Sequence, residues 1–288
     1  MQNLKTLIEQ FEKNRKIHIS ILDLSGILST PSTKIDFKNA IHSKEFCNIA
    51  KSTECGYRTC LRCKMLANTK AIMYMKPFLG QCSYGLYEAV VPVVIDKNVM
   101  AIVYVGNAVV DIERVKACIK KTCERTGVSI QELYQQLNRC EFIDNPNELY
   151  QIAEIISDYL KMLYCSLPKN RTELHWLVSS MKVYADKRFC YNISLRELAI
   201  TYQKNEQYIG RLFKKHMGIG FNEYCMELRL KKAEMLLSRG NDKIINIAFD
   251  CGFNNVSYFN RAFRKKYGIS PTQYRMRHND SLTLTSPD

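Results

Sequence analysis

The feature that most constrains the fold is a passage that the chain repeats. "RLFKKHMGIG" at residues 211–220 returns as "RAFRKKYGIS" at residues 261–270, with Arg, Phe, Lys, Gly and Ile in register. Tyr224 and Tyr274 extend the repeat, each six residues after its Gly. Two copies of one short surface predict two copies of one structural unit in the C-terminal part of the chain.

The first copy follows a short helix with a strong start signal. In "SLRE", Ser194 is expected as the N-cap and Glu197 as the third helical residue, which together form a capping box. A second helix is expected from Asn205, with Tyr208 and the apolar residues after it facing inward. A short helix, a tight turn and a second helix make a helix-turn-helix, whose second helix enters the DNA major groove.

The second copy repeats this plan. Gly252 closes its first helix, because glycine accepts the positive φ that such a turn requires. Asn254 and Asn255 are both suited to cap the helix that follows, and the sequence leaves the choice open. Residues 221–240 predict one long helix that joins the two units. Two recognition helices on a rigid connector could enter successive major grooves and bind an asymmetric site without dimerising.

The repeated residues also predict how each unit ends. Phe213 and Phe263 are expected as buried anchors, and Gly218 and Gly268 as the C-terminal stops of the recognition helices. A plain helical bundle, with its basic residues simply in water, is the alternative interpretation of the repeat. The paired basic helix ends and the distribution of charge argue against it.

Positive charge is concentrated where the repeat lies. The chain of 288 residues has a formal net charge of +14, and residues 171–280 hold 20 Lys and Arg against 10 Asp and Glu. A basic surface attracts polyanions through phosphate contacts and the release of counterions. Double-stranded DNA is therefore the expected partner. A membrane is not, since no basic amphipathic helix beside a hydrophobic anchor supports it.

The first part of the chain predicts a mixed fold. A helix and a strand with alternating Ile17, Ile19 and Ile21 are followed by helices, three strands and further helices. This order is that of an α+β sensory module with a ligand cavity under its sheet. The expected helices cover residues 44–51, 59–71, 112–126, 130–137 and 147–164, and the expected strands cover residues 78–84, 88–95 and 100–107, with a hairpin turn at 96–98.

Boundaries and location follow from the polar segments and from the start of the chain. "SLPKNR" at 166–171 is expected as a linker between a sensor at 1–165 and a DNA-binding domain at 172–280, with a frayed tail at 281–288. The chain starts without a charged segment followed by an apolar one, and no apolar run is long enough to span a bilayer. We therefore expect a cytoplasmic protein.

The helix before the linker has an apolar seam with spacings of three and four. Because the seam is short for a coiled coil, it could pack on its own domain or form a dimer contact that a ligand repacks. The second alternative predicts a homodimer. The seam consists of Leu149, Ile152, Ile156, Tyr159 and Leu163.

Several motifs in order resemble the DNA-binding domain of the AraC family of transcription regulators. They are "GFNNVSYFNRAFRKKYGISPTQYR" and, upstream, "RLKKAEMLL" and "IINIAFDCGF". The resemblance covers residues 172–278 and implies an all-α domain with two helix-turn-helix motifs in a transcription activator, with RNA polymerase as a partner besides DNA. The chain departs from the family pattern at Gln203, where the first turn usually has a Gly.

The resemblance also implies DNA contacts. The family reads bases early on each recognition helix, where Arg can reach guanine with two hydrogen bonds and Asn can reach adenine. Basic residues later on each helix are expected to hold phosphates. Gly210 has no side chain, so base recognition by the first helix-turn-helix is expected to depend more on Gln207 and Arg211. Base contacts are expected from Gln207, Gly210, Arg211, Ser257, Asn260 and Arg261, and phosphate contacts from Lys214, Lys215, Arg264 and Lys265.

The front half resembles the PocR sensory domain, a PAS-like module linked to small organic ligands. The stretches that carry the resemblance are "EFCNIA", "GYRTCLRC", "QCSYGLYEAVVPVVID" and "AIVYVGNA". The resemblance implies an α+β, PAS-like sensor for a small-molecule effector, and cysteines typical of the family match Cys47, Cys60 and Cys82. We expect the ligand pocket to be lined by Cys60, Cys82, Tyr84, Tyr87 and Glu88.

The cysteines offer an alternative. Twelve cysteines in a chain of this kind are expected to be reduced. Cys55, Cys60 and Cys63, with Cys82 or Cys47 as a fourth ligand, have a spacing that overlaps that of plant-type [2Fe–2S] ligation and could also hold zinc. We favour packing of reduced cysteines, without a cofactor. A redox- or metal-sensing regulator is the alternative to one controlled by an organic ligand.

Catalytic motifs find little support in the sequence. "GQCSYG" has one residue too many for Gly-x-Ser-x-Gly, and the sequence contains neither a P-loop nor a Gly-x-Gly-x-x-Gly. Ada-type DNA repair proteins also join a cysteine–zinc module to an AraC-like domain, but their Pro-Cys-His-Arg acceptor motif does not occur here. We therefore expect a DNA-binding transcription regulator controlled by a small ligand, and no enzyme.

Overall fold

The structure, a computed structural model, describes residues 3–29, 33, 35–40, 42, 44–166, 173–191, 193–240 and 242–283. The chain divides into two units, residues 1–176 and 177–288. The predicted linker, apart from Ser166, and residues 284–288 of the predicted tail lie outside the described residues.

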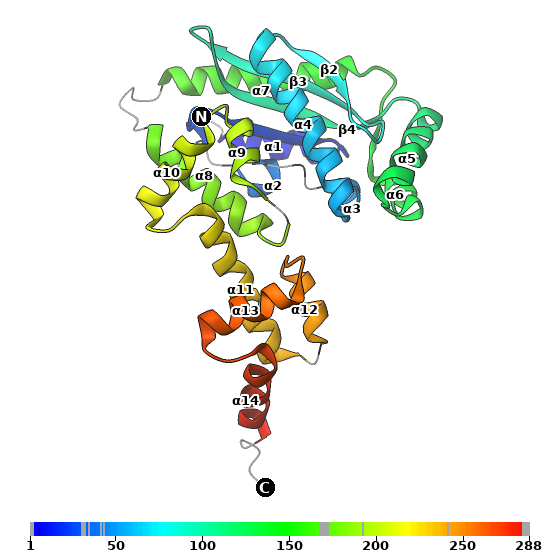
Figure 1. Cartoon of the computed structure of the whole chain (residues 1–288). Coiled ribbons are helices and arrows are strands. Elements are labelled where there is room, and N and C mark those ends of the chain that lie inside the picture. Colours follow the sequence, from blue (N-terminus) through cyan, green and yellow to red (C-terminus); the bar gives the residue numbers. More distant parts are fainter. Residues whose placement is uncertain are drawn as a thin grey trace. The chain divides into compact units, whose positions relative to one another are not determined.

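The first unit is built on one sheet (Figure 1). Its strands are β1 (His18–Asp23), β2 (Phe78–Gln81), β3 (Tyr87–Ile95), β4 (Asn98–Val109) and β5 (Glu141–Phe142). The strand order is β1-β4-β3-β2, with antiparallel neighbours, and β5 pairs parallel with the end of β4. Asp96 and Lys97, between β3 and β4, both have positive φ (48° and 60°), as a type I′ hairpin requires. The predicted hairpin turn is confirmed.

Helices surround this sheet and match the expected α+β order. α4 begins after Thr53, whose side chain accepts a hydrogen bond from the Gly56 N–H at 3.0 Å, and it is longer than expected. The short α2 and β5 were not expected, because elements of this length carry no periodic signal. The helices are α1 (Leu4–Glu12), α2 (Phe37–Ala40), α3 (Glu45–Ile49), α4 (Glu54–Tyr74), α5 (Ile112–Thr126), α6 (Ile130–Gln136) and α7 (Asn147–Ser166), with 3₁₀ turns η1 (Ile27–Ser29) and η2 (Leu137–Arg139).

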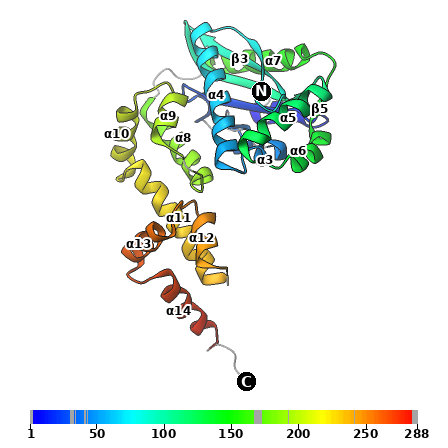
Figure 2. The ribbon, with the colours of Figure 1, turned by 45° about the vertical axis from the view of Figure 1, so that its right-hand side comes forward.

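The two faces of the sheet bury different side chains, because side chains alternate along a strand. One face packs against α1 and α7 and the other against α4 (Figures 1 and 2). The central strands give the first face Ala89, Val91, Val93, Ala101, Val103 and Val105. They give the second face Val90, Ile102 and Tyr104.

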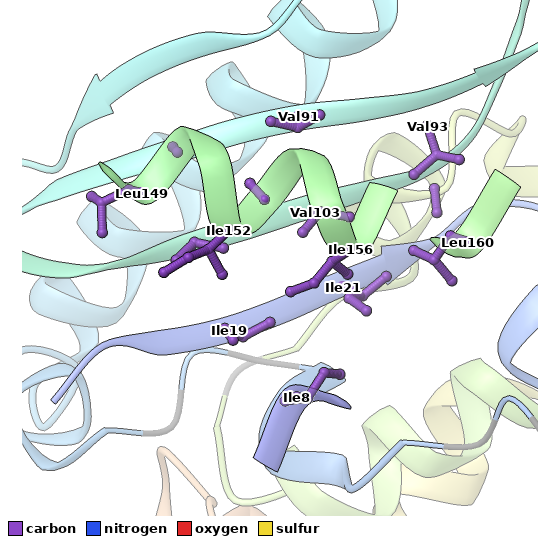
Figure 3. Close-up of a cluster of buried hydrophobic side chains, with 14 of the residues drawn as sticks. Ile8, Ile19, Ile21, Val91, Val93, Val103, Leu149, Ile152, Ile156 and Leu160 are labelled. Carbon is purple, nitrogen blue, oxygen red and sulfur yellow. The ribbon is translucent and has the colours of Figure 1, made fainter. Parts of the chain in front are cut away.

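The apolar seam of α7 packs inside this unit. Of the predicted seam, Leu149 and Ile156 are fully buried, Ile152 and Leu163 are nearly so, and Tyr159 packs partly buried against the same core. Leu160, which was not in the predicted seam, is also fully buried. Figure 3 shows α7 lying across the sheet, with seam side chains among those of β1, β3 and β4. The seam prediction was therefore right about the apolar face but wrong about a dimer contact, because the sheet already covers that face.

The second unit is helical, and Figures 1 and 2 show one long helix, α11, between its two groups of shorter helices. The division between the two units falls within α8. Among the described residues, none of the helices combines the length and the apolar character needed to cross a membrane. The helices are α8 (Glu173–Arg188), α9 (Leu195–Thr201), α10 (Glu206–Met217), α11 (Phe221–Arg239), α12 (Ile244–Asp250), α13 (Val256–Tyr267) and α14 (Pro271–Thr283).

Candidate functional site

The first helix-turn-helix consists of α9 and α10. The Ser194 hydroxyl accepts a hydrogen bond from the Glu197 N–H at 3.1 Å, and the Glu197 carboxylate accepts from the Ser194 N–H at 3.2 Å, which confirms the predicted capping box. The Asn205 side chain caps α10 by accepting from the N–H groups of Gln207 and Tyr208. The Tyr208 side chain is 40% exposed, so the expectation that it faces inward is wrong.

The second helix-turn-helix consists of α12 and α13. Gly252 ends the turn of α12 with a φ of +87°, and a Cβ there would collide with the backbone of Cys190. Asn255, and not Asn254, caps α13 by accepting a backbone N–H at 3.0 Å. The second copy therefore follows the plan of the first.

The repeated Phe and Gly residues hold the predicted places. Phe213 and Phe263 are fully buried at matching positions of α10 and α13. Gly218 and Gly268 end these helices with φ of +77° and +79°, the left-handed C-cap that glycine adopts without strain. Each recognition helix is thus anchored and stopped by the same pair of residues.

The repeated tyrosines close each unit. The Tyr224 ring stands edge-on to the Phe213 ring, with the ring centroids 5.7 Å apart. The Tyr274 ring stands edge-on to the Phe263 ring, with the centroids 5.4 Å apart. The Tyr224 hydroxyl donates to Asp186 at 2.5 Å, and the Tyr274 hydroxyl to Glu234 at 2.9 Å. The repeat therefore specifies both the recognition helix and the contact that holds its exit.

The predicted DNA contacts lie on the outer sides of α10 and α13. Gly210 differs from the others: a Cβ there would lie 2.9 Å from Leu195 Cδ2, so α9 packs closely against α10 at this point. This close packing accounts for the glycine at position 210. The exposed residues are Gln207, Arg211, Lys214 and Lys215 on α10 and Ser257, Asn260, Arg261, Arg264 and Lys265 on α13.

Two exposed aromatic residues join this surface. Tyr208 and Tyr258 are 40% and 48% exposed at matching positions of the two recognition helices. The sequence did not identify them, because Tyr is amphipathic: Tyr208 was expected on the inner face, and Tyr258 was not singled out. The signal that could have found them is the repeat itself, which places Tyr at both positions.

Hydrogen bonds, besides the connector α11, join the two helix-turn-helix units. The Arg229 guanidinium donates to the Phe189 carbonyl at 2.7 Å and to the Tyr191 carbonyl at 2.9 Å. One helical turn later, Lys232 Nζ donates to the Asp250 carbonyl at 2.6 Å. α11 therefore holds both the segment between α8 and α9 and the end of α12.

The first unit has a cavity of about 60 Å³ on the α4 side of the sheet. This volume has room for a few water-sized groups. α4, β3 and the turn between β2 and β3 supply the residues that were predicted to line a ligand pocket. All five lie in the cavity wall: Cys60, Cys82, Tyr84, Tyr87 and Glu88. That they bind a ligand stays a prediction.

Glu88 is the charged group of the cavity wall. His42 Nε2 lies 2.5 Å from one carboxylate oxygen, and Lys64 Nζ lies 3.1 Å from both. Burial by itself raises the pKa of Glu88, but His42 and Lys64 outweigh it and lower that pKa to about 2. Burial lowers the pKa of His42 to about 4. We therefore assign an ion pair of Glu88 with Lys64 and a neutral His42 whose Nε2–H donates to the carboxylate.

Sequence patterns did not point to His42 and Phe46, which also line this cavity, or to Lys64, which pairs with Glu88. These residues come from separate segments of the chain, and no spacing relates them. The available signal was Glu88, a carboxylate in an otherwise apolar strand, because a buried carboxylate requires a partner.

The cysteines of α4 do not converge. Cys55 and Cys60 are five residues apart, which turns them about 140° from each other on a helix. The Cys55 thiol is exposed and donates to the Arg125 carbonyl at 3.6 Å, whereas Cys63 Sγ lies 2.9 Å from Ser83 Oγ. Among the described residues, no three His, Cys, Asp or Glu side chains are arranged to hold a metal ion.

Four cysteines line the cavity, Cys47, Cys60, Cys63 and Cys82, and burial favours the thiol form of three of them. Burial raises the pKa of Cys47 to about 12, and it also raises the pKa values of Cys60 and Cys82. Metals bind the thiolate, which this environment disfavours. The alternative of an iron–sulfur or zinc site at Cys47, Cys55, Cys60, Cys63 and Cys82 is therefore not supported.

Two family models match the chain. One, described as the sensory domain found in PocR, matches residues 1–166. The other, described as a helix-turn-helix domain, matches residues 198–277. Each match covers one of the two regions whose geometry is described above.

Curated relatives resemble parts of the chain. The uncharacterized HTH-type transcriptional regulator YijO of Escherichia coli is 35% identical over 107 residues, 37% of this chain and 38% of that protein. The HTH-type transcriptional activator RhaS of Escherichia fergusonii is 25% identical over 158 residues, 54% of this chain and 57% of that protein. The chain thus spans less than two thirds of the length of either relative.

A solved structure also resembles the chain. It is the C-terminal domain of AraT, a response regulator from Geobacillus stearothermophilus, with 31% identity. The match covers 37% of this chain and 88% of that domain, with a TM-score of 0.35.

Proposed function

Because the chain belongs to the family of AraC-type, sequence-specific DNA-binding transcription regulators with a PocR-type sensory domain, we propose that it regulates transcription in response to a small organic ligand. The ligand binds the cavity of the first unit, and both recognition helices of the second unit bind one asymmetric site in double-stranded DNA.

One observation carries the DNA-binding part of this proposal. α10 and α13 present the same kind of exposed, basic outer side, and each is stopped by a left-handed glycine and anchored by a buried Phe. α11 and its hydrogen bonds join the two. Two such helices suit successive major grooves, which lie about 34 Å apart on one face of DNA.

The side chains support separate roles in this contact. Arg211 and Arg261 would each read a guanine through two hydrogen bonds, Asn260 an adenine, and Gln207 and Ser257 neighbouring base edges. Gly210 has no side chain with which to read a base, so the first recognition helix would depend on Gln207 and Arg211. The remaining basic residues would bind phosphates without reading sequence, namely Lys214, Lys215, Arg264 and Lys265.

The ligand would act through the cavity of the first unit. Cys60, Cys82, Tyr84, Tyr87 and Glu88 would contact it, and the small volume favours an organic molecule of few atoms. Because ligand binding and DNA binding would be coupled, each would raise the affinity for the other by the same factor.

The proposal includes RNA polymerase as a partner and positive regulation, in line with the printed name of RhaS as a transcriptional activator. A homodimer would raise apparent affinity for repeated sites through effective concentration. It would have to use a surface other than the seam of α7, which is buried against the sheet.

The test is to select binding sites from random duplex DNA with the full chain and to map protection on the selected site. We expect a non-palindromic sequence with two protected segments about one helical turn apart. Lys265→Ala should weaken binding to all sequences and lower the salt slope by about one, while base preference is kept. Selection that returns no common sequence, with or without ligand mixtures, would contradict the proposal.

A further inference from the structure

The cavity of the sensor adjoins a second hollow. The outer hollow has a volume of about 300 Å³, against about 60 Å³ for the inner cavity. Phe46 and Asn107 line both. These two side chains therefore form the partition between an inner and an outer compartment.

Asn107 is held in an unusual conformation at this partition. The pairing of β3 with β4 shifts register between Tyr87 and Glu88, because Tyr87 pairs with Ala108 and Glu88 with Gly106. This β-bulge leaves Asn107 unpaired in the ladder, with a φ of +71° although it is nearly buried. Bulges and left-handed non-glycine residues cost free energy and are concentrated at functional sites.

The Asn107 side chain ties the walls of the outer hollow together. Its Nδ2 donates to the carbonyls of Lys16 at 3.0 Å and Arg139 at 3.4 Å. Its Oδ1 accepts a weak hydrogen bond from the Cys140 thiol at 3.6 Å. Asn107 therefore joins β4 to the segments at Lys16 and at Arg139 and Cys140.

The outer hollow is basic. Lys16, Lys44, Arg139 and Arg15 line it, against the single carboxylate of Glu45. Arg15 is neutralised by Glu141 at 2.8 Å and Glu148 at 3.1 Å, and Lys16 Nζ donates to the Asn138 carbonyl at 2.7 Å. In the part of the chain that the structure describes, the side chains of Lys44 and Arg139 have neither an ion pair nor a hydrogen bond.

The inner cavity, unlike the outer hollow, does not favour an anion. Its thiols are neutral because burial raises the pKa values of Cys47, Cys60 and Cys82. Its one carboxylate, Glu88, already holds Lys64 in an ion pair and accepts a hydrogen bond from His42, so these groups are not available to a second anion. A ligand with one anionic end would therefore place that end outside the partition and its uncharged end inside.

We propose that the ligand of the sensor is a short-chain carboxylate. Its carboxylate lies between Lys44 and Arg139, and its uncharged chain passes between Phe46 and Asn107 into the inner cavity. This inference rests on the proposed control by a small organic ligand and adds the charge and the orientation of that ligand.

The experiment is calorimetric titration of the full chain with acetate, butyrate and hexanoate, and with the corresponding primary amides, at equal ionic strength. We expect saturable binding of at least one carboxylate and binding at least about tenfold weaker for its amide, which lacks the charge. Lys44→Gln with Arg139→Gln should reduce carboxylate binding at least about tenfold. Lys120→Gln with Lys121→Gln, which removes two exposed charges from α5, should leave it unchanged.

Three results would overturn the inference. They are amides that bind as well as the acids, an equal loss in both double variants, and no saturable binding of any carboxylate. Binding of the amides alone would leave the proposed control by a small organic ligand intact, whereas a chain that selects no DNA sequence would contradict the proposed function instead. Equal unfolding temperatures of the unliganded variants check that each is folded.

Discussion

Gln203 and Gly252 stand at the same place in the two helix-turn-helix units, and both adopt a left-handed backbone, with φ of +53° and +87°. Each follows the residue that ends the first helix of its unit. The departure from the family's usual glycine therefore leaves the turn intact. It places a side chain where an L-residue is strained by about 1–2 kcal/mol.

The first prediction is that relief of this strain stabilises the folded chain. Gln203→Gly should raise the free energy of unfolding by about 0.5–1 kcal/mol, because the strain lost exceeds the extra entropy that glycine gives the unfolded chain. Urea unfolding of the full chain measures the change. Gln203→Ala keeps the strained φ and should give no gain. Equal effects of the two substitutions would mean that the turn is not strained.

The equivalent glycine should be intolerant of a side chain. Gly252→Ala adds a Cβ that collides with the Cys190 backbone, at a φ that alanine disfavours, so the free energy of unfolding should fall by more than about 2 kcal/mol. Gly220→Ala is the matched control, because its φ is −71° and a Cβ there meets nothing within 4 Å. Two variants of equal stability would contradict the packing of this turn.

The inner face of α7 gives a second matched pair. Ile156 is fully buried against the sheet, whereas Ile155, its neighbour, is 51% exposed. Ile156→Asp should therefore lower the unfolding free energy of the sensor by about 4 kcal/mol or more, and Ile155→Asp by less than about 0.5 kcal/mol. Thermal unfolding followed by circular dichroism compares them. An Ile156→Asp chain of normal stability that had changed from dimer to monomer would restore the seam as a subunit contact.

Local signals predicted the second unit well. The capping box of Ser194 and Glu197 and the stops at Gly218 and Gly268 depend on residues within a few positions of each other, so their sequence is sufficient to recognise them. Asn254 and Asn255 could not be separated, because the choice depends on which N–H groups the folded turn presents.

Long-range relationships in the first unit were not available from sequence. The seam of α7 showed an apolar face, but periodicity does not say whether its own sheet or another subunit covers that face. His42, Lys64 and Glu88 meet only because the fold brings a loop, α4 and β3 together. The bulge at Asn107 has no sequence signal, since it depends on the pairing register of β3 and β4.

The buried His42 predicts a pH dependence of stability. Its pKa is lowered from 6.5 to about 4, first by burial and also by Lys64 and His18, although Glu88 opposes the shift. The unfolded chain thus binds a proton near pH 6.5 that the folded chain does not bind until pH falls toward 4. His42 should therefore contribute stability that is full above pH 6.5 and lost as pH falls toward 4, with a slope of up to about 1.4 kcal/mol per pH unit.

The measurement is the difference in unfolding free energy between the parent chain and His42→Gln from pH 5 to 7. Tyr104 and Glu88 also face His42, but their pKa values lie outside this window, that of Glu88 at about 2 and that of Tyr104 raised well above 10. The parent chain should gain stability with pH relative to the variant. A constant difference across the window would show that His42 titrates normally.

The central claim is that α10 and α13 read the two halves of one asymmetric site, and the base preferences of Arg211→Ala and Arg261→Ala test it most directly. Each variant of the full chain is measured against every single base-pair change in a selected site. We expect each to lose about 1–3 kcal/mol of discrimination at one base pair, with the two affected positions about ten base pairs apart. Preferences that are unchanged in both variants, or relaxed at the same base pair in both, would contradict the account.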